Sequence, residues 1–337
     1  YGEATRKFFI ENTNPLILID FAGVKVFETA TVDVNILLYV KEKNTFNTLA
    51  CILKDKELKE LSLYVSQHAQ TTQFKNADSW VILSDIEQRI KAKIEAIGTP
   101  LKDWDISINY GIKTGFNDAF IINGEKRAEL IAQDPKSAEI IRPILRGRDI
   151  KRYGYEFADL YIITTFPSLK IDIELYPAVK QHLLSFGYDR LKQTGEKGAR
   201  KKTNNKWFET QDSIGYWEDF YKQKIVWKAV GRNLAFSILE EGKFVTAPAS
   251  FITSENSLYY ILGFLCSSFA KYFIYNNSDT TGAGDIMLNI QSLVKIPIPQ
   301  PSINNQEEVE NIISEIIKGK KENIDTILLE NKLDEII

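Results

Sequence analysis

The sequence has few residues of the kinds that build disulfide or metal sites. Its 337 residues include only two cysteines and two histidines. Cys51 and Cys266 lie far apart in apolar surroundings, so no disulfide framework is expected, and a reducing, cytoplasmic compartment is favoured. Neither His68 nor His182 has a cysteine or another histidine at metal-ligand spacing, so no metal site is expected.

Long hydrophobic runs and catalytic motifs are also missing. The longest apolar run, 258–269, is too short to cross roughly 30 Å of bilayer, so we expect a buried helix there and no membrane span. Residues 1–7 contain neither an initiator methionine nor the apolar core of a signal peptide, which suggests a truncated chain. Gly-x-Ser-x-Gly, Gly-x-Gly-x-x-Gly and P-loop patterns are absent, so we expect no catalytic residues.

Charge of one sign does not dominate the chain, but it is unevenly distributed. The formal net charge is −3, and this total alone argues against a nucleic-acid partner. Between residues 142 and 206, however, 14 residues are basic and 7 are acidic, whereas acidic residues dominate from 306 onward. A basic middle with acidic flanks can bind a polyanion despite a negative total, because the local distribution decides.

Apolar runs near the N-terminus predict strands at 16–20 and 32–40. Near-continuous runs of this kind suit strands covered on both faces, as in α/β sheets. Two strands do not form a stable α/β domain, so we expect their partners to be missing from this chain. A helix follows at 85–97, with Ser84 as its cap and Glu87 completing a capping box. Its apolar face is formed by Ile86, Ile90, Ile94 and Ile97.

The rest of the chain predicts a mixed α/β fold. Residues 101–301 combine short strands, aromatic residues and turns, and end in an extended, proline-stiffened segment at 296–301. Two amphipathic helices follow, which would pack on the body as an antiparallel hairpin. Their apolar residues are Val309, Ile312, Ile313, Ile316 and Ile317 in the first, and Ile324, Ile327, Leu328 and Leu333 in the second, which starts near 323. We predict domains at 1–98, 101–301 and 302–337.

Two segments carry residue types that bind phosphate. In 109–120, glycines lie around Lys113 and Thr114, which suits close approach of the backbone to a phosphate. A tight turn with a solvated lysine is the alternative. Five cations between 142 and 152 would dock a phosphate backbone or read guanine edges, with Asp149 holding one arginine in place. A solvated, charged turn is the alternative there.

Two further segments suit contacts with bases. The strongly basic segment 195–208 ends in Trp207 and Phe208, which would either stack on a base or anchor the loop in the core. The segment 225–233 predicts a strand whose end presents Lys228, Arg232 and Asn233. Arginine favours guanine and asparagine favours adenine in the major groove, so these side chains suit sequence readout.

Taken in order, these segments resemble one family. The matching stretches are 106–122, 134–137, 146–150, 207–209, 211–212, 216–217, 224–227, 262–265, 267–268 and 296–299, with Tyr153 and Tyr272. Together they resemble the TaqI-like C-terminal specificity domain of type IIG restriction–modification enzymes and related phage-defence methyltransferases. Residues 12–20 and 25–33 are similar to the last two strands of the family's Rossmann-like methyltransferase domain.

The resemblance implies a module that recognises specific sequences in duplex DNA for an adenine-N6 methyltransferase. Such enzymes bind S-adenosylmethionine through an early glycine motif and hold the flipped adenine with Asn/Asp-Pro-Pro-Tyr/Phe. Neither motif is present, since residues 14–17 read Asn-Pro-Leu-Ile. We therefore expect no cofactor in this fragment, with the methyltransferase portion, and a nuclease if the parent also cuts DNA, lying upstream.

The same resemblance implies DNA contacts at named positions. Backbone contacts are expected from Lys113, Thr114, Arg146, Arg148 and Arg152, with Lys151 among them. Sequence readout is expected from Arg200, Lys201, Lys202, Lys206, Lys228, Arg232 and Asn233, and a polar loop at 276–284 adds Thr280 and Thr281. The alternative is a protein-interaction scaffold, which would dock partner subunits through the acidic C-terminal helices and the unpaired strands.

Overall fold

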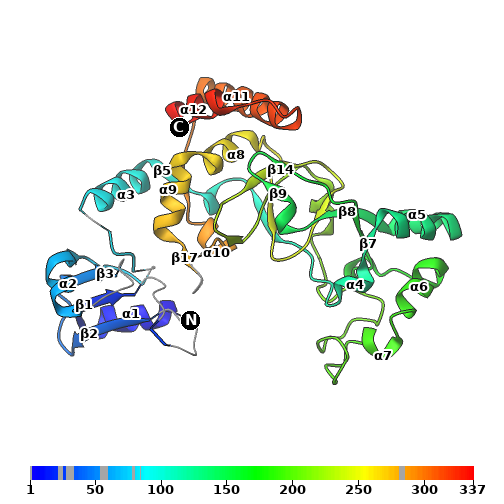
Figure 1. Cartoon of the computed structure of the whole chain (residues 1–337), viewed down its shortest axis with the longest axis horizontal. Coiled ribbons are helices and arrows are strands. Elements are labelled where there is room, and N and C mark those ends of the chain that lie inside the picture. Colours follow the sequence, from blue (N-terminus) through cyan, green and yellow to red (C-terminus); the bar gives the residue numbers. More distant parts are fainter. Residues whose placement is uncertain are drawn as a thin grey trace. The chain divides into compact units, whose positions relative to one another are not determined.

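The computed structural model describes residues 2–21, 26–27, 34–53, 60–77, 80–83, 85–280 and 285–337 (Figure 1). The chain divides into two compact units, both discontinuous in sequence. Unit 1 comprises residues 1–103, 230–233 and 269–300, and unit 2 comprises 104–229, 234–268 and 301–337. The consecutive domains predicted from the sequence remain a proposal.

Unit 1 contains a four-stranded sheet in the order β2-β1-β3-β4. The strands are β1 (Asn14–Asp20), β2 (Asn35–Val40), β3 (Thr48–Ile52) and β4 (Gln70–Thr72), with helices α1 (Gly2–Asn12) and α2 (Leu61–His68). β1 runs antiparallel to β2 and parallel to β3. Both predicted strands are therefore present, although residues 32 and 33 lie outside the described residues.

The expectation that both strands are covered on two faces is wrong for β2. Leu18 and Ile19 of β1 are buried, whereas Ile36, Leu38 and Tyr39 of β2 are exposed. β2 is an edge strand, and its apolar side chains lack the covering contacts that bury those of β1.

The helix predicted at 85–97 is confirmed as α3 (Asp85–Ile97), but its isoleucine face is mostly exposed. Ile94 is 7% exposed, whereas Ile86 and Ile97 are 63% and 71% exposed. Ser84, the predicted cap, lies outside the described residues. β5 (Gly98–Pro100) follows α3 and pairs with β19 (Pro297–Pro299), so the proline-stiffened segment is a short strand.

The remaining elements of unit 1 include a small sheet that carries one predicted site residue, Thr280. It has the order β13-β18-β17, from β13 (Val230–Gly231), β17 (Asp279–Thr280) and β18 (Ile286–Met287). The unit also contains most of α9 (Ser268–Asn277) and α10 (Ile290–Leu293).

Unit 2 contains two four-stranded sheets. One has the order β15-β8-β11-β7, from β7 (Ile121–Asn123), β8 (Ile141–Leu145), β11 (Leu160–Ile163) and β15 (Phe244–Val245). The other is antiparallel, with the order β14-β12-β16-β6, from β6 (Ser107–Tyr110), β12 (Lys224–Trp227), β14 (Phe236–Leu239) and β16 (Ser250–Thr253). Residues of β12, β14 and β16 are buried throughout, as their apolar runs predict.

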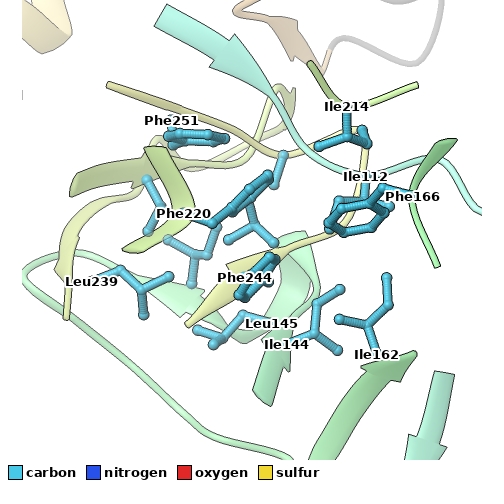
Figure 2. Close-up of a cluster of buried hydrophobic side chains, with 14 of the residues drawn as sticks. Ile112, Ile144, Leu145, Ile162, Phe166, Ile214, Phe220, Leu239, Phe244 and Phe251 are labelled. Atoms are coloured by element: carbon cyan, nitrogen blue, oxygen red, sulfur yellow. The ribbon is translucent and has the colours of Figure 1, made fainter. Parts of the chain in front are cut away.

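An aromatic core joins these sheets (Figure 2). The ring of Phe220 stacks on Phe244 at 4.5 Å and contacts Phe251 at 4.6 Å, measured between ring centroids. A second core lies beneath α5 (Gly124–Gln133) and α6 (Pro177–Leu184), together with the short helices α4 (Asn117–Phe120) and α7 (Tyr188–Leu191). The two cores give unit 2 a rigid frame on which its turns are held.

The predicted pair of C-terminal helices is confirmed as α11 (Ile303–Lys321) and α12 (Ile327–Ile336), the second starting four residues later than predicted. α11 packs on α8 (Tyr259–Cys266), the buried helix expected within 258–269 (Figure 1). A Cβ on Gly263 would lie 2.8 Å from Val309 Cγ1, so this packing requires glycine. The mixed α/β class is also confirmed. Among the described residues, no helix is long and apolar enough to span a bilayer.

Candidate nucleic-acid interface

Three parallel segments end together on one side of unit 2. β8 and β15 are parallel, and Ile112 forms a parallel bridge with Thr246, the residue that follows β15. The amide of Thr246 donates to Leu145 O at 2.9 Å, and that of Ala247 donates to Ile112 O at 3.1 Å. With neighbouring strands about 4.8 Å apart, the residues that follow, Lys113 and Arg146, leave the sheet within about 10 Å of each other.

Arg146 begins the turn after β8 and is held rigidly by Asp149. Its Nε and Nη2 atoms donate to the two carboxylate oxygens at 3.0 and 2.8 Å, and its amide donates to Asp149 Oδ2 at 2.8 Å. Burial alone would raise the pKa of Asp149, but the hydrogen bonds from Arg146 outweigh it and lower that pKa. The predicted pairing of Asp149 with an arginine is thus confirmed, and the carboxylate stays charged.

The other cations of this turn differ in their surroundings. Arg148, in the 3-10 turn η3 (Gly147–Asp149), is exposed. Lys151, at the end of β9 (Ile150–Lys151), forms an exposed ion pair of 3.5 Å with Glu156. A Cβ on Gly147 would lie 3.5 Å from Lys228 Cβ, so the structure brings Lys228 beside the turn. These three side chains can still reach a polyanion, since exposed pairs are weak.

Arg152 instead faces the C-terminal helices. Its Nε and Nη2 atoms donate to the Cys266 carbonyl oxygen at 3.1 and 2.6 Å, and its Nη1 pairs with Glu330 of α12. Its guanidinium also lies 4.7 Å from the centroid of the Tyr153 ring. Arg152 therefore ties the turn to α8 and α12, and we no longer propose it as a phosphate contact.

The 113–117 turn places Lys113 in solvent and buries Thr114. The Thr114 hydroxyl donates to Asn117 Oδ1 at 2.7 Å and accepts from the Phe116 amide at 3.1 Å. Gly115 has φ +77°, a left-handed conformation that favours glycine. A shallow pocket of about 380 Å³ lies here, lined by Lys113, Asn117 and Gln211 among others. Thr114 therefore shapes the turn, while Lys113 is the group available to a ligand.

The basic loop at 195–206 is built around a buried arginine. Arg200 is 2% exposed and donates to the carbonyl oxygens of Leu191, Thr114 and Trp207, at 2.7, 2.9 and 2.7 Å. Burial, together with the smaller effect of the nearby Arg190, lowers its pKa to about 10. Since all these bonds are internal, Arg200 positions the loop, and we no longer propose it for readout.

The loop holds its other cations outward. Lys201, Lys202 and Lys206 are exposed. Phe208 is buried in the second core, so it anchors the loop, and Trp207 is half-buried with its ring against Phe208 and Tyr188. The structure adds two residues that sequence analysis missed, Arg190, whose guanidinium lies 4.2 Å from the Phe116 ring, and Gln211. Both approach the 113–117 turn only through folding, so no sequence spacing marks them.

Four of the residues predicted to contact DNA belong to unit 1. Arg232 and Asn233 follow β13 and are exposed, the Arg232 side chain by 81%, with its Nε 3.7 Å from Asp285 Oδ1. The Tyr275 hydroxyl bonds to the Arg232 carbonyl and fixes the backbone there. Thr280 ends β17, while Thr281 lies outside the described residues.

The two histidines and the two cysteines are held by contacts within the fold. His182 is hydrogen-bonded to the Ala119 carbonyl oxygen at 3.0 Å, and burial lowers its pKa. His68 stacks on Tyr64, and both cysteines are free and buried. Across the residues that the structure describes, no three His, Cys, Asp or Glu side chains gather as a metal site would require.

Comparisons with known proteins agree with this architecture. Residues 142–298 match the TaqI-like C-terminal specificity domain. The chain is 21% identical over 363 residues to the type II methyltransferase M.BstVI of Geobacillus stearothermophilus, covering 98% of this chain and 61% of that protein. It is 27% identical over 241 residues to the type II methyltransferase M.MjaIV of Methanocaldococcus jannaschii, covering 68% of this chain and 77% of that protein.

Among solved structures, the type IIL restriction-modification enzyme MmeI, determined in complex with DNA, is similar with a TM-score of 0.56. The identity is 13%, so this likeness concerns the fold, and it covers 97% of this chain and 43% of MmeI. The chain therefore spans about three fifths of M.BstVI and less than half of MmeI. Residues 142–298 form a TaqI-like C-terminal specificity domain, in a chain homologous to type II DNA methyltransferases.

Proposed function

We propose that this chain recognises a specific sequence in duplex DNA for an enzyme that methylates adenine at N6. The observation that carries the proposal is the common end of the three parallel segments, where Lys113, Arg146 and Lys228 gather in a specificity domain. Rigid backbone turns that present cations at one end of a sheet suit phosphate contacts, which fix the register of a protein on DNA.

The residues divide into two roles. Lys113, Arg148 and Lys151 are exposed and serve as phosphate contacts, while Arg146, held by Asp149, presents a fixed edge of its guanidinium. Sequence readout falls to the outward lysines Lys201, Lys202 and Lys206, to Lys228, and to Arg232, Asn233, Thr280 and Thr281. The two roles predict different effects of substitution.

S-adenosylmethionine belongs to the parent enzyme in this proposal. The pocket beside Lys113 has no acidic residue in its lining to hold ribose hydroxyls, as nucleotide sites commonly do, so we assign no residue of this chain to the cofactor. Methylation, and any cleavage, would require the remaining portion of the enzyme, acting on DNA in the cytoplasm. The adenine specificity rests on the resemblance to the family as a whole.

A docking role has one observation in its favour, the exposed apolar residues Ile36, Leu38 and Tyr39 on the edge strand β2. The acidic C-terminal helices favour it less, because Glu330 pairs with Arg152 and Lys320, and Glu308 with Lys332. We therefore keep DNA recognition as the proposal for this chain and the scaffold as the alternative.

The proposal is tested by selecting duplexes that bind the chain from a random library and measuring the affinity of the enriched duplexes at two salt concentrations. An enriched motif with salt-sensitive binding supports DNA recognition, because neutralised phosphates release counterions. Binding without a motif would assign readout to the rest of the enzyme. Salt-independent assembly with protein subunits, without DNA binding at low salt, would favour the scaffold.

A further inference from the structure

A second pocket of unit 2 opens at the opposite end of β8 and β15 from Lys113 and Arg146. Glu139 and Ile140 immediately precede β8, Phe244 begins β15, and all three line this pocket of about 290 Å³. Ligand pockets in proteins measure about 300–1,000 Å³, so this volume suits one ring system with a small substituent. None of the DNA-binding proposals above uses these residues.

Five of the ten residues that line the pocket are aromatic. Phe166 and Phe244, which lie close together in Figure 2, are buried at its base. Trp217 and Tyr221 form one wall, with their ring planes at 85° and their centroids 6.1 Å apart. Tyr221 is 41% exposed, so part of its ring remains available to a ligand. Partly exposed rings over a buried aromatic base favour stacking with a planar ring.

Polar groups at the rim add directional bonds. Glu139 Oε2 accepts from the Tyr176 hydroxyl at 2.9 Å, which leaves Oε1 to accept from a ligand. Arg142 donates through Nε to the Tyr221 hydroxyl at 3.1 Å and through Nη1 to the carbonyl oxygens of Ala138 and Ile141, which leaves its Nη2 group to bind an anion.

The charges around the pocket disfavour a cationic ligand. Arg142 lies 5.9 Å from the Tyr221 ring centroid and Lys136 lies 5.3 Å from that of Tyr176. The two cations outnumber the single carboxylate of Glu139 and already occupy two ring faces. A neutral planar ring attached to an anionic group satisfies all of these features, because the anion would approach Arg142 and Lys136.

We propose that this pocket binds a single unpaired nucleotide whose base carries an exocyclic amino group. The base would stack on Trp217 with its edge toward the perpendicular Tyr221 ring, its amino group would donate to Glu139, and its phosphate would contact Arg142. The ligand is either a free nucleotide or a nucleotide extruded from a DNA strand, which share this chemistry. The pocket stands at the far end of the sheet from the proposed DNA contacts, so it does not depend on them.

The test measures binding of AMP, CMP and TMP to the full chain, by calorimetry and by quenching of tryptophan fluorescence. AMP and CMP are expected to bind about three- to tenfold more tightly than TMP, which lacks the amino group, since one hydrogen bond of this kind is at stake. Glu139→Ala should abolish this preference, and Trp217→Phe should remove the quenching. Glu174→Ala is the matched control, because Glu174 is an exposed carboxylate of the same unit paired with Lys180.

Two arms distinguish the source of the nucleotide. Binding of free AMP identifies a mononucleotide site, whereas a response only to DNA with an unpaired 2-aminopurine identifies an extruded base. No response to any nucleotide at millimolar concentration, or the same base preference in Glu139→Ala and Glu174→Ala, would overturn the proposal. Arg148→Glu distinguishes this nucleotide site from the proposed duplex-DNA interface, because it should weaken duplex binding and leave AMP binding unchanged.

Discussion

Arg200 donates a hydrogen bond of 2.9 Å to the backbone carbonyl oxygen of Thr114, 86 residues earlier in the chain. This bond joins the turn that presents Lys113 to the loop that presents Lys201, Lys202 and Lys206. Two further bonds, to Leu191 O and Trp207 O, complete the coordination of the guanidinium. The loop's cations are therefore held in place by an arginine that does not itself face solvent.

Arg200→Met should lower the free energy of unfolding by about 2–4 kcal/mol, because it leaves buried carbonyl groups without donors. Urea denaturation followed by circular dichroism measures this loss. The control is Lys201→Met, at an exposed neighbouring position, which should stay within about 0.5 kcal/mol of the wild type. Equal effects of the two substitutions would show that Arg200 is not the anchor of the loop.

Charge reversal at Lys113 or Arg148 should weaken binding to all DNA sequences alike and lower the slope of log affinity against log salt concentration by about 1 for the lost contact. Fluorescence anisotropy over a salt series measures both quantities. Lys126→Glu on α5, which pairs with Glu129, is the control and should leave the slope unchanged. A slope that is unchanged in Lys113→Glu and Arg148→Glu would remove these residues from the proposed interface.

Arg232→Ala should act differently, by relaxing the preference at one base position. The expected loss is about 1–3 kcal/mol on the preferred sequence and little on sequences altered at that position, as for a bidentate contact to guanine. Competition between duplexes that differ at single positions measures it. A uniform loss across sequences would instead assign Arg232 to the phosphate backbone.

Lys224 should make stability depend on pH. It is buried on β12, and burial lowers its pKa to about 7, against about 10.4 in an unfolded chain. Between these values the unfolded chain binds a proton that the folded chain does not, so the free energy of unfolding rises with pH, by up to about 1.4 kcal/mol per unit.

Lys224→Met isolates this effect, because it retains a long apolar side chain and has no group to titrate. Denaturation of both proteins at several values from pH 7 to pH 9 should show the wild type gaining stability relative to the variant as pH rises. Parallel curves would mean that Lys224 is protonated in the folded protein at these pH values, stabilised by the carbonyl oxygens of Glu240 and Lys243 near its Nζ.

The sequence by itself determined the local elements and the kind of fold. The apolar spacing of Val309, Ile312, Ile313 and Ile316 predicts α11, and the apolar runs predict β1, β2 and β12. These patterns depend on neighbours within one or two turns of a helix or along one strand, so they can be recognised in the sequence without knowledge of the fold. The order of short motifs was sufficient to indicate the specificity-domain family.

Only the tertiary structure decided which cations are available to a ligand. Arg148, Arg152 and Arg200 look alike in a basic stretch, yet Arg200 is buried, and both Arg152 and Arg200 are bonded to carbonyl oxygens of distant residues. The exposure of β2 and of the isoleucine face of α3 was likewise not predictable, because an apolar sequence pattern does not show which element covers that face in the fold. Burial and pairing depend on residues far apart in sequence, and folding alone brings these together.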